Sequence, residues 1–255
     1  MERLGNLLFE LASEDRLRIL FKLQEKPTRL TQISEKLKLT IQETSRHLSR
    51  LSEAKLITKD AEGFYRLLPF GEDLLYLMPG IEFFSKHRDY FNTHSISRLP
   101  QEFLTRIGEL EKCLLNDDVF AALHLADNVV RDAKDFIWII GNQVFMSMVP
   151  LLEEKIKRGA PFRLILPEDL VPPLGFKALP YIPGRIERRT LKHVDLTMVI
   201  SEKEARVVYP TQDGKMDPSA FASTEQSPLK WCKDLYEHYW SKAQTGQPKG
   251  YPSQP

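Results

Sequence analysis

Residues Thr31 to Leu68, TQISEKLKLTIQETSRHLSRLSEAKLITKDAEGFYRLL, carry two helical patterns followed by two short strand patterns. The helical patterns are close together and separated by two residues, whereas the strand patterns flank a polar turn that contains Gly63. Glycine in such a turn can adopt positive φ, as a tight hairpin requires. In chain order we expect a helix over 32–37, a turn at 38–39, a helix over 41–54, and strands over 56–59 and 64–68. This order indicates a winged helix-turn-helix.

The start of the second helix has a clear capping signal. Thr40 is expected to be its N-cap, and Glu43 stands three residues later, which is the spacing of a capping box. Thr31 is expected to cap the shorter helix before it. Apolar or small residues that recur at helical spacing predict the inward face of the second helix: Ile41, Thr44, Leu48 and Leu51.

The outward face of this helix has the residue types that read DNA. The major groove admits one α-helix, arginine can bind guanine or phosphate, and glutamine can bind adenine. Short hydroxyl side chains and a helix N-terminus also favour phosphate. We therefore expect double-stranded DNA as the partner, with contacts from Thr40, Gln42, Ser45, Arg46 and Arg50 on the helix and from Lys59 and Arg66 on the wing.

An alternative function stays open for the same segment. A helical bundle with a solvated charged face would show the same residue spacing. The alternative function is therefore a winged-helix module that binds a protein partner and no DNA. Glu43 on the outward face also repels phosphate unless it caps its own helix.

The segment Ser45 to Ile57, SRHLSRLSEAKLI, resembles the recognition helix and first wing strand of ArsR-type winged-helix repressors. The residues that carry the resemblance are Ser45, His47, Leu48, Leu51 and Ala54. The resemblance implies a DNA-contact role for Gln42, Ser45, Arg46, His47 and Arg50. The metal-sensing cysteine pair of some of these repressors is missing, so we expect no metal site and no cofactor.

Composition narrows the class of protein further. The 255 residues suit one large or two ordinary domains, and the net charge of +1 means that any affinity for DNA must come from a local patch. Cys113 and Cys232 lie far apart and outside any CxxC motif, which argues against a disulfide framework or a zinc site. We see no signal peptide and no apolar run long enough for a membrane span, and we expect a soluble, cytoplasmic protein.

The rest of the chain divides into regions of different character. Two helices are expected within 7–23, the second beginning after Ser13, and a further helix is expected to end at Pro79-Gly80. The polar segment 92–100 marks a boundary. The expected division is a winged-helix domain over 1–78, a helical linker or dimerisation region over 79–115, an α/β domain over 116–243 and a disordered tail over 244–255.

The region around 79–115 is rich in apolar side chains. They would form either the seam of a homodimer or packing within one chain, and the sequence does not decide between these. The residues concerned are Leu74, Leu75, Leu77, Phe83, Phe84, Tyr90 and Phe91.

The second half alternates apolar strands with helices. Residues 136–140 and 162–166 are continuous apolar runs separated by a helical stretch, which is typical of a buried parallel βαβ unit. Three more strands are expected over 185–191, 196–200 and 205–209, the last two joined by a hairpin turn. An aromatic-rich helix follows from about residue 227. The predicted fold class is an α+β winged helix-turn-helix followed by an α/β domain.

Most of the chain, about 5–243, resembles archaeal regulators described as methanogenesis regulatory proteins, which join an ArsR-like winged helix to an α/β effector-like domain. The segments that carry this resemblance are LTMVISEKEA (196–205), VVYPTQDGK (207–215) and LKWCKDLY (229–236), ahead of Tyr239-Trp240. The resemblance implies a transcriptional regulator, a dimer, and a sensor domain for an unidentified small-molecule effector.

The order IWIIGN…KRGAPFRLIL also resembles a half-domain of the phospholipase D type. Those enzymes need His-x-Lys-x4-Asp, in which histidine is the nucleophile. Here Asp195 stands in the lysine position after His193, and Ile200 replaces the aspartate. We therefore expect no enzymatic activity.

Two sets of residues are candidates for binding an effector. A basic cluster could bind an anion, or it could protect a solvated edge strand from aggregation. Its members are Arg185, Arg188, Arg189, Lys192 and His193. Asn142 and Glu168-Asp169 follow the expected parallel strands, at the edge where α/β sheets bind ligands.

Overall fold

The computed structural model describes residues 1–174, 176, 179 and 182–251, except the side chains of 119–125. The chain divides into two compact units, residues 1–79 and 80–255. Helix α5 (Pro69–Lys86) contains the point of division.

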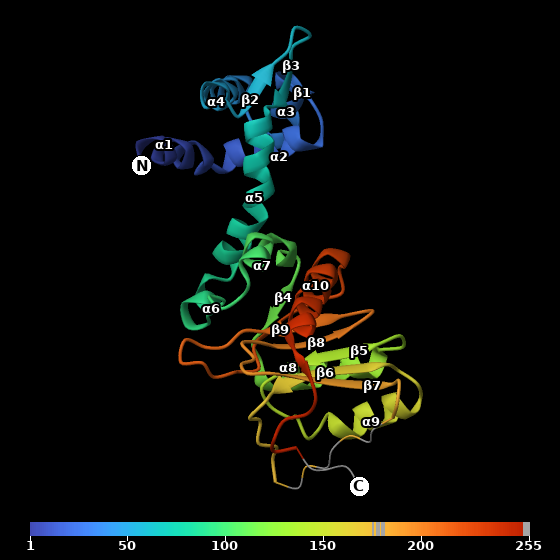
Figure 1. The fold of residues 1–255 in the computed structure, drawn as a ribbon. Coiled ribbons are helices and arrows are strands. Elements are labelled where there is room, and N and C mark those ends of the chain that lie inside the picture. The colour runs from blue at the N-terminus through green and yellow to red at the C-terminus, as the bar shows by residue number, and fades with distance from the viewer. Residues whose placement is uncertain (175, 177–178, 180–181, 252–255) are drawn as a thin grey trace. The chain divides into compact units, whose positions relative to one another are not determined.

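The first unit is a winged helix-turn-helix, as predicted (Figure 1). Its three strands form an antiparallel sheet in the order β1-β3-β2. One buried cluster of leucine and isoleucine side chains from α1 to α5 holds the unit together. The elements are α1 (Glu2–Leu11), α2 (Glu14–Glu25), β1 (Thr28–Arg29), α3 (Leu30–Leu37), α4 (Ile41–Glu53), β2 (Ile57–Lys59), β3 (Phe64–Leu67) and the start of α5.

Local sequence signals explain where two helices of this unit begin. Ser13 caps α2 and Thr40 caps α4, as expected. Helix α3 begins at Leu30, so the prediction that Thr31 caps it is wrong: Arg29 is the N-cap, and its backbone N–H donates to the Gln32 side chain. The two-residue strand β1 is too short for a sequence pattern to reveal.

The expected end of a helix at Pro79-Gly80 is also wrong, because α5 continues through both residues to Lys86. Proline inside a helix costs about 3 kcal/mol. Burial of Phe83, which is 0% exposed, contributes about 1.5–3 kcal/mol in the opposite direction. Gly80 also lies close to Ile107, since a Cβ on Gly80 would be 3.3 Å from Ile107 Cγ2. Tertiary packing thus keeps the helix continuous.

The second unit is an α/β domain built on an eight-stranded mixed sheet in the order β11-β7-β6-β5-β8-β9-β10-β4. The parallel strands are β5, β6 and β7, and the remaining pairs are antiparallel. The strands are β4 (Leu114–Asn116), β5 (Ile137–Ile140), β6 (Phe162–Pro167), β7 (Ile186–Leu191), β8 (Thr197–Ser201), β9 (Ala205–Val208), β10 (Ala220–Ser223) and β11 (Gln244–Thr245).

Helices cover both faces of this sheet (Figure 1). Strand β5 shows why its sequence is continuously apolar: Trp138 and Ile140 belong to one core cluster, and Ile137 belongs to the other. The helices are α6 (Arg88–Thr93), α7 (Gln101–Thr105), the 3-10 helix η1 (Ile107–Leu110), α8 (Val119–Asp132), α9 (Val149–Lys157) and α10 (Gln226–Lys242). The predicted parallel βαβ unit and the β8–β9 hairpin are both confirmed.

Residues 79–115 were expected to form a helical linker or dimerisation region, but many of their apolar side chains belong to the core of the second unit. Phe83, Tyr90 and Phe103 share a core cluster with Trp231 of α10, and all four are at most 6% exposed. Phe83 and Tyr90 therefore pack within one chain and are not available for a dimer seam. The end of the expected helical region over 79–115 is instead the start of strand β4, which pairs with β10.

The tail that was expected to be disordered is instead ordered from residue 244 to residue 251. Strand β11 pairs with β7, the Lys249 N–H donates to the Glu168 carbonyl, and Tyr251 is buried against Phe176. Residues 252–255 of the predicted tail lie outside the described residues. No helix in the described part of the chain is both long and apolar enough to cross a membrane.

Candidate nucleic-acid interface

Helix α4 follows α3 through a tight turn at Lys38. Lys38 has φ +57°, the left-handed conformation that ends α3, and its backbone N–H bonds back to that helix. The Ser34 hydroxyl donates to the Leu39 carbonyl at 2.6 Å and fixes the turn from inside. These local bonds set the angle at which α4 leaves the turn.

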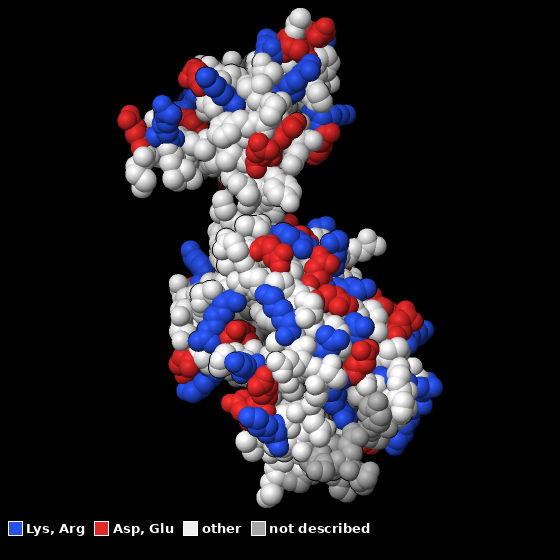
Figure 2. Space-filling view, in the orientation of Figure 1, with Lys and Arg blue, Asp and Glu red and all other residues white. Residues whose placement is uncertain are grey.

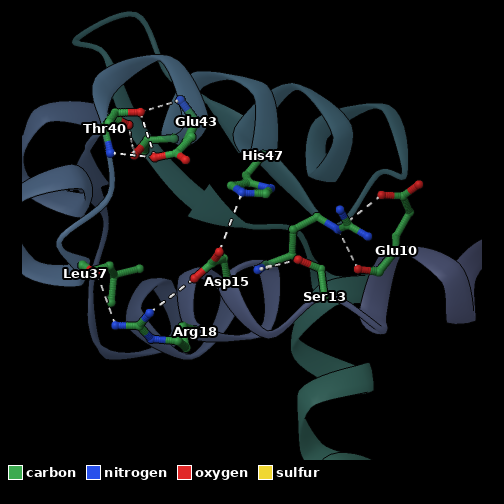
Figure 3. A network of polar contacts seen from close by, with 10 residues as sticks. Glu10, Ser13, Asp15, Arg18, Leu37, Thr40, Glu43 and His47 are labelled. Carbon is green, nitrogen blue, oxygen red and sulfur yellow. Dashed lines mark hydrogen bonds and ion pairs between the residues drawn. The ribbon is translucent and has the colours of Figure 1, made fainter.

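The N-terminus of α4 is closed by a reciprocal capping box, as the sequence predicts (Figure 3). The Glu43 N–H donates to Thr40 Oγ1 at 3.2 Å, and the Thr40 N–H donates to Glu43 Oε2 at 2.9 Å. The Thr40 hydroxyl also donates to Glu43 Oε2 at 2.7 Å. These hydrogen bonds lower the pKa of Glu43. Glu43 is therefore a capping residue, which removes most of the objection that its position raised.

The inward face of α4 is close to the predicted one. Thr44, Leu48 and Leu51 are each at most 1% exposed. Ile41 is 52% exposed, so its predicted inward position is wrong. Because Ile41 is the first residue of the helix, its side chain lies beyond the edge of the core. An exposed apolar side chain at this point can contact a thymine methyl group.

Three predicted reading residues on α4 are exposed and available. They are Gln42, Ser45 and Arg46, and no hydrogen bond or ion pair within the described part of the chain engages them. They lie on the first two turns of α4, and their DNA-contact role stays a prediction.

His47 does not share this exposed surface. It is 8% exposed, and its Nε2 lies 4.0 Å from Asp15 Oδ2 of α2 (Figure 3). Burial lowers the pKa of His47 and Asp15 opposes that shift. The expected direct DNA contact by His47 is not supported by this position, because the ring is turned towards α2.

Arg50 is also engaged. Its Nη2 lies 2.6 Å from Glu10 Oε1 and its Nε lies 3.0 Å from Glu10 Oε2, and its guanidinium stacks over the Phe9 ring at 5.1 Å. The hydrogen bond from Arg50 lowers the pKa of Glu10. Arg50 thus connects α4 to α1 and is not free to bind DNA in this conformation.

The two predicted cations of the wing differ in whether they form an ion pair. Lys59 and Arg66 are both exposed. Lys59 Nζ lies 5.6 Å from the centre of the Tyr65 ring, whereas Arg66 forms an ion pair with Asp60. Asp60 also accepts a hydrogen bond from the Phe64 N–H at 2.8 Å. Lys59 is therefore the more available of the two.

Two further exposed cations, Arg29 and Lys38, are not among the predicted contact residues. Arg29 caps α3 and stacks over the Phe64 ring at 4.6 Å, and Lys38 stands in the turn before α4. The signal for Lys38 was present, because a lysine between the two helices lies next to a phosphate-binding helix N-terminus. Basic and acidic side chains are interspersed over the face in view (Figure 2).

The candidates for effector binding in the second unit are not gathered into one anion site. Arg185 donates to the Ile156 and Lys157 carbonyls, Arg188 to the Leu179 carbonyl, and Arg189 to the Trp240 carbonyl. Lys192 and His193 are exposed. The basic cluster is therefore used largely for internal bonds. Asn142 follows β5 and its buried Oδ1 has no hydrogen-bond partner, while Glu168 and Asp169 follow β6.

One segment of the chain matches a known protein family. Residues 13–59 match the family described as bacterial regulatory protein, arsR family. This segment is similar to the helix-turn-helix domain of the ArsR family. The match covers α2 to β2, so the ArsR-type domain contains every predicted contact residue except Arg66. No curated protein matches the chain.

Solved structures give three likenesses of fold. An archaeal chromatin protein, TrmBL2, whose structure is described as showing a novel mode of DNA binding, is 13% identical, with 92% of this chain and 94% of that chain covered and a TM-score of 0.42. NucT from Helicobacter pylori is 10% identical over 53% of this chain and 99% of that chain, with a TM-score of 0.42. Nuc from Salmonella typhimurium, a phospholipase D family member, is 14% identical over 53% of this chain and 97% of that chain, with a TM-score of 0.39.

Proposed function

We propose that this protein is a transcriptional regulator that binds double-stranded DNA by placing α4 of its ArsR-type domain in the major groove. The observation that carries the proposal is the exposed row of Gln42, Ser45 and Arg46 on a capped helix whose opposite face is buried. Amide, hydroxyl and guanidinium groups at these positions can reach base edges and phosphates.

The wing and the turn add phosphate contacts in this proposal. Lys59 on β2 and Lys38 before α4 are exposed cations on either side of the recognition helix in sequence. Arg50 and Arg66 take a supporting role, because each is already paired with a carboxylate. Among the described residues, few free cations lie on α4, the turn before it and the wing, so we expect binding to use two copies of the reading surface.

A homodimer supplies these two copies. Exposed apolar side chains on α1 and α5 of the first unit are the proposed contact surface, and Leu4, Leu7 and Phe70 line one groove there. Exposure of large apolar residues at this density is typical of an interaction surface. The members of the proposed surface are Leu4, Leu8, Phe9, Phe70, Tyr76 and Leu77, which are between 47% and 77% exposed.

The α/β unit is proposed to act as a sensor without catalysis. Asp195, in the position where a phospholipase D motif has lysine, forms an ion pair with Arg98 at 2.8 Å. An effector that binds one dimer geometry better than another would change the spacing of the two recognition helices and hence the affinity for the operator.

Selection of bound sequences from random duplexes, followed by titration of the best duplex at increasing salt, tests the proposal. We expect an enriched sequence with two half-sites and an affinity that falls steeply with salt, because phosphate binding releases counterions. Absence of duplex binding at low salt would overturn the proposal. It would favour the alternative of a winged-helix module that binds proteins.

A further inference from the structure

A cavity of about 240 Å³ lies over one face of the sheet in the second unit. Strands β8, β9 and β10 form its floor, and α8, the segment before α9 and the segment before β10 form its walls. Most of its lining is apolar. Its apolar lining includes Phe145, Met148, Val199, Val208 and Ala220.

A buried arginine lines this apolar cavity. Arg206 of β9 is 3% exposed, and its Nη2 is buried and has no hydrogen-bond partner. The nearest carboxylate, Glu204, leaves its Oε1 3.6 Å from Arg206 Nη1, which is beyond hydrogen-bond distance. An unpaired donor of a buried guanidinium is costly, so its position against a cavity indicates a missing acceptor.

A second buried polar atom lies on the same floor. Thr197 of β8 is 8% exposed, and its Oγ1 is buried and without a partner. In the β8–β9 pairing Thr197 is opposite Val208 and Val199 is opposite Arg206, so Thr197 and Arg206 are diagonal neighbours on one face of the sheet. A single acceptor group between them can bond to both.

The charges around the cavity limit the kind of anion. Arg206 is the only basic side chain of its lining within the described residues, and Asp127 and Asp217 line it as well. Asp217 Oδ2 is bonded to His94 Nε2 at 3.0 Å. With Asp127 and Asp217 in the described lining and Glu204 beside Arg206, the lining has no surplus positive charge, so it excludes a phosphate dianion and leaves a monoanion to bind through direct hydrogen bonds to the free Arg206 Nη2. The planar guanidinium fork matches a carboxylate.

We propose that this cavity binds a small organic monocarboxylate, with its carboxylate on Arg206 Nη2 and Thr197 Oγ1 and its apolar body against Phe145, Met148 and Val208. The volume is below the range of roughly 300–1,000 Å³ for sites of drug-sized ligands, which restricts the ligand to a small aromatic or short aliphatic acid. This site differs from the basic cluster that the sequence suggested. The proposal deepens the sensor role in the proposed function and rests on that role only for the effect of binding on DNA.

Isothermal titration calorimetry of the full chain with 3-phenylpropionate, its primary amide, and straight-chain carboxylates of increasing length tests the site directly. We expect saturable binding of the carboxylate, at least about tenfold weaker binding of the uncharged amide, and loss of affinity once the aliphatic chain exceeds the cavity. Arg206→Met should weaken carboxylate binding by at least about tenfold. The matched control Arg131→Met, an exposed arginine at the end of α8, should bind as the parent does.

A second variant covers the case in which Arg206→Met does not fold. Ser147 lines the cavity and is exposed, so Ser147→Trp should fill the cavity without disturbing the core and should abolish binding. No binding by any carboxylate of the series, equal binding of acid and amide, or unchanged binding by Ser147→Trp would each overturn the proposal. Because the titration contains no DNA, its failure is separate from a failure of duplex binding.

Discussion

Arg50 of the recognition helix α4 and Glu10 of α1 form a two-point ion pair, with Nη2 2.6 Å from Oε1 and Nε 3.0 Å from Oε2. The Glu10 side chain is 15% exposed and also lies 3.3 Å from Arg16 of α2. One carboxylate thus connects three helices of the reading domain. This relationship changes the role of Arg50 from a presumed DNA contact to a residue that holds α4 in place.

Glu10→Gln should therefore lower the melting temperature of the first unit by a few degrees at neutral pH. The Arg50 hydrogen bond lowers the pKa of Glu10 below its ordinary value of 4.5. A carboxyl whose pKa is lowered by folding stabilises the fold above the ordinary value, and this contribution is lost as pH falls through the lowered value. The difference in unfolding free energy between parent and variant should shrink as pH falls below 4.5. Glu62→Gln, an exposed acid on the wing, is the control; equal pH profiles for parent and Glu10→Gln would contradict the prediction.

His47 should make the first unit less stable as the pH falls below 6.5. Burial lowers the pKa of His47 from its ordinary value of 6.5, so the unfolded chain takes up a proton more readily than the folded one. The stabilisation is complete above 6.5 and decreases as pH falls towards the lowered value. His47→Gln should remove this part of the pH dependence.

Hydrogen exchange of the α4 amides at several pH values is the measurement for His47. Tryptophan fluorescence is unsuitable, since Trp138, Trp231 and Trp240 all lie in the second unit. His193→Gln, an exposed histidine of the second unit, should leave the α4 profile unchanged. An α4 profile that keeps its pH dependence in His47→Gln would show that His47 is not its cause.

Arg46→Ala should weaken DNA binding more than Arg50→Ala does. Arg46 is exposed and has no partner among the described residues, whereas Arg50 is held by Glu10. If Arg46 binds phosphate, the salt dependence of the association constant should lose about one unit of slope for each recognition helix. Fluorescence anisotropy with the selected duplex over a range of salt concentrations measures both quantities. Arg131→Ala is the control, and a larger loss for Arg50→Ala would restore the sequence-based order of these two arginines.

Leu8→Glu should convert the proposed homodimer to a monomer. Leu8 is 53% exposed on α1, and a charge placed in an apolar contact is costly to bury. Sedimentation velocity at several protein concentrations measures the change. Leu114→Glu on β4, 69% exposed in the second unit, should leave the oligomeric state as it is. A parent protein that stays monomeric at all concentrations would contradict the dimer proposal.

The sequence predicted local structure well wherever neighbouring residues decide it. Thr40 and Glu43 predicted the capping box because both partners lie within one helical turn. The unbroken apolar run over 136–140 predicted a strand covered on both faces. By contrast, Pro79 predicted a helix end that packing of Gly80 and Phe83 overrides.

The sequence by itself determined that this protein has a winged helix-turn-helix followed by an α/β domain, because helical and strand periodicity are properties of adjacent residues. Only the tertiary structure decided which side chains of α4 are free. Arg46 and Arg50 look alike along the helix, yet Glu10, forty residues before Arg50, engages one of them. The same holds for Arg206, whose strand pattern gave no sign of the cavity beside it. Availability of a charged group depends on what distant segments bring to it, and sequence spacing does not contain that information.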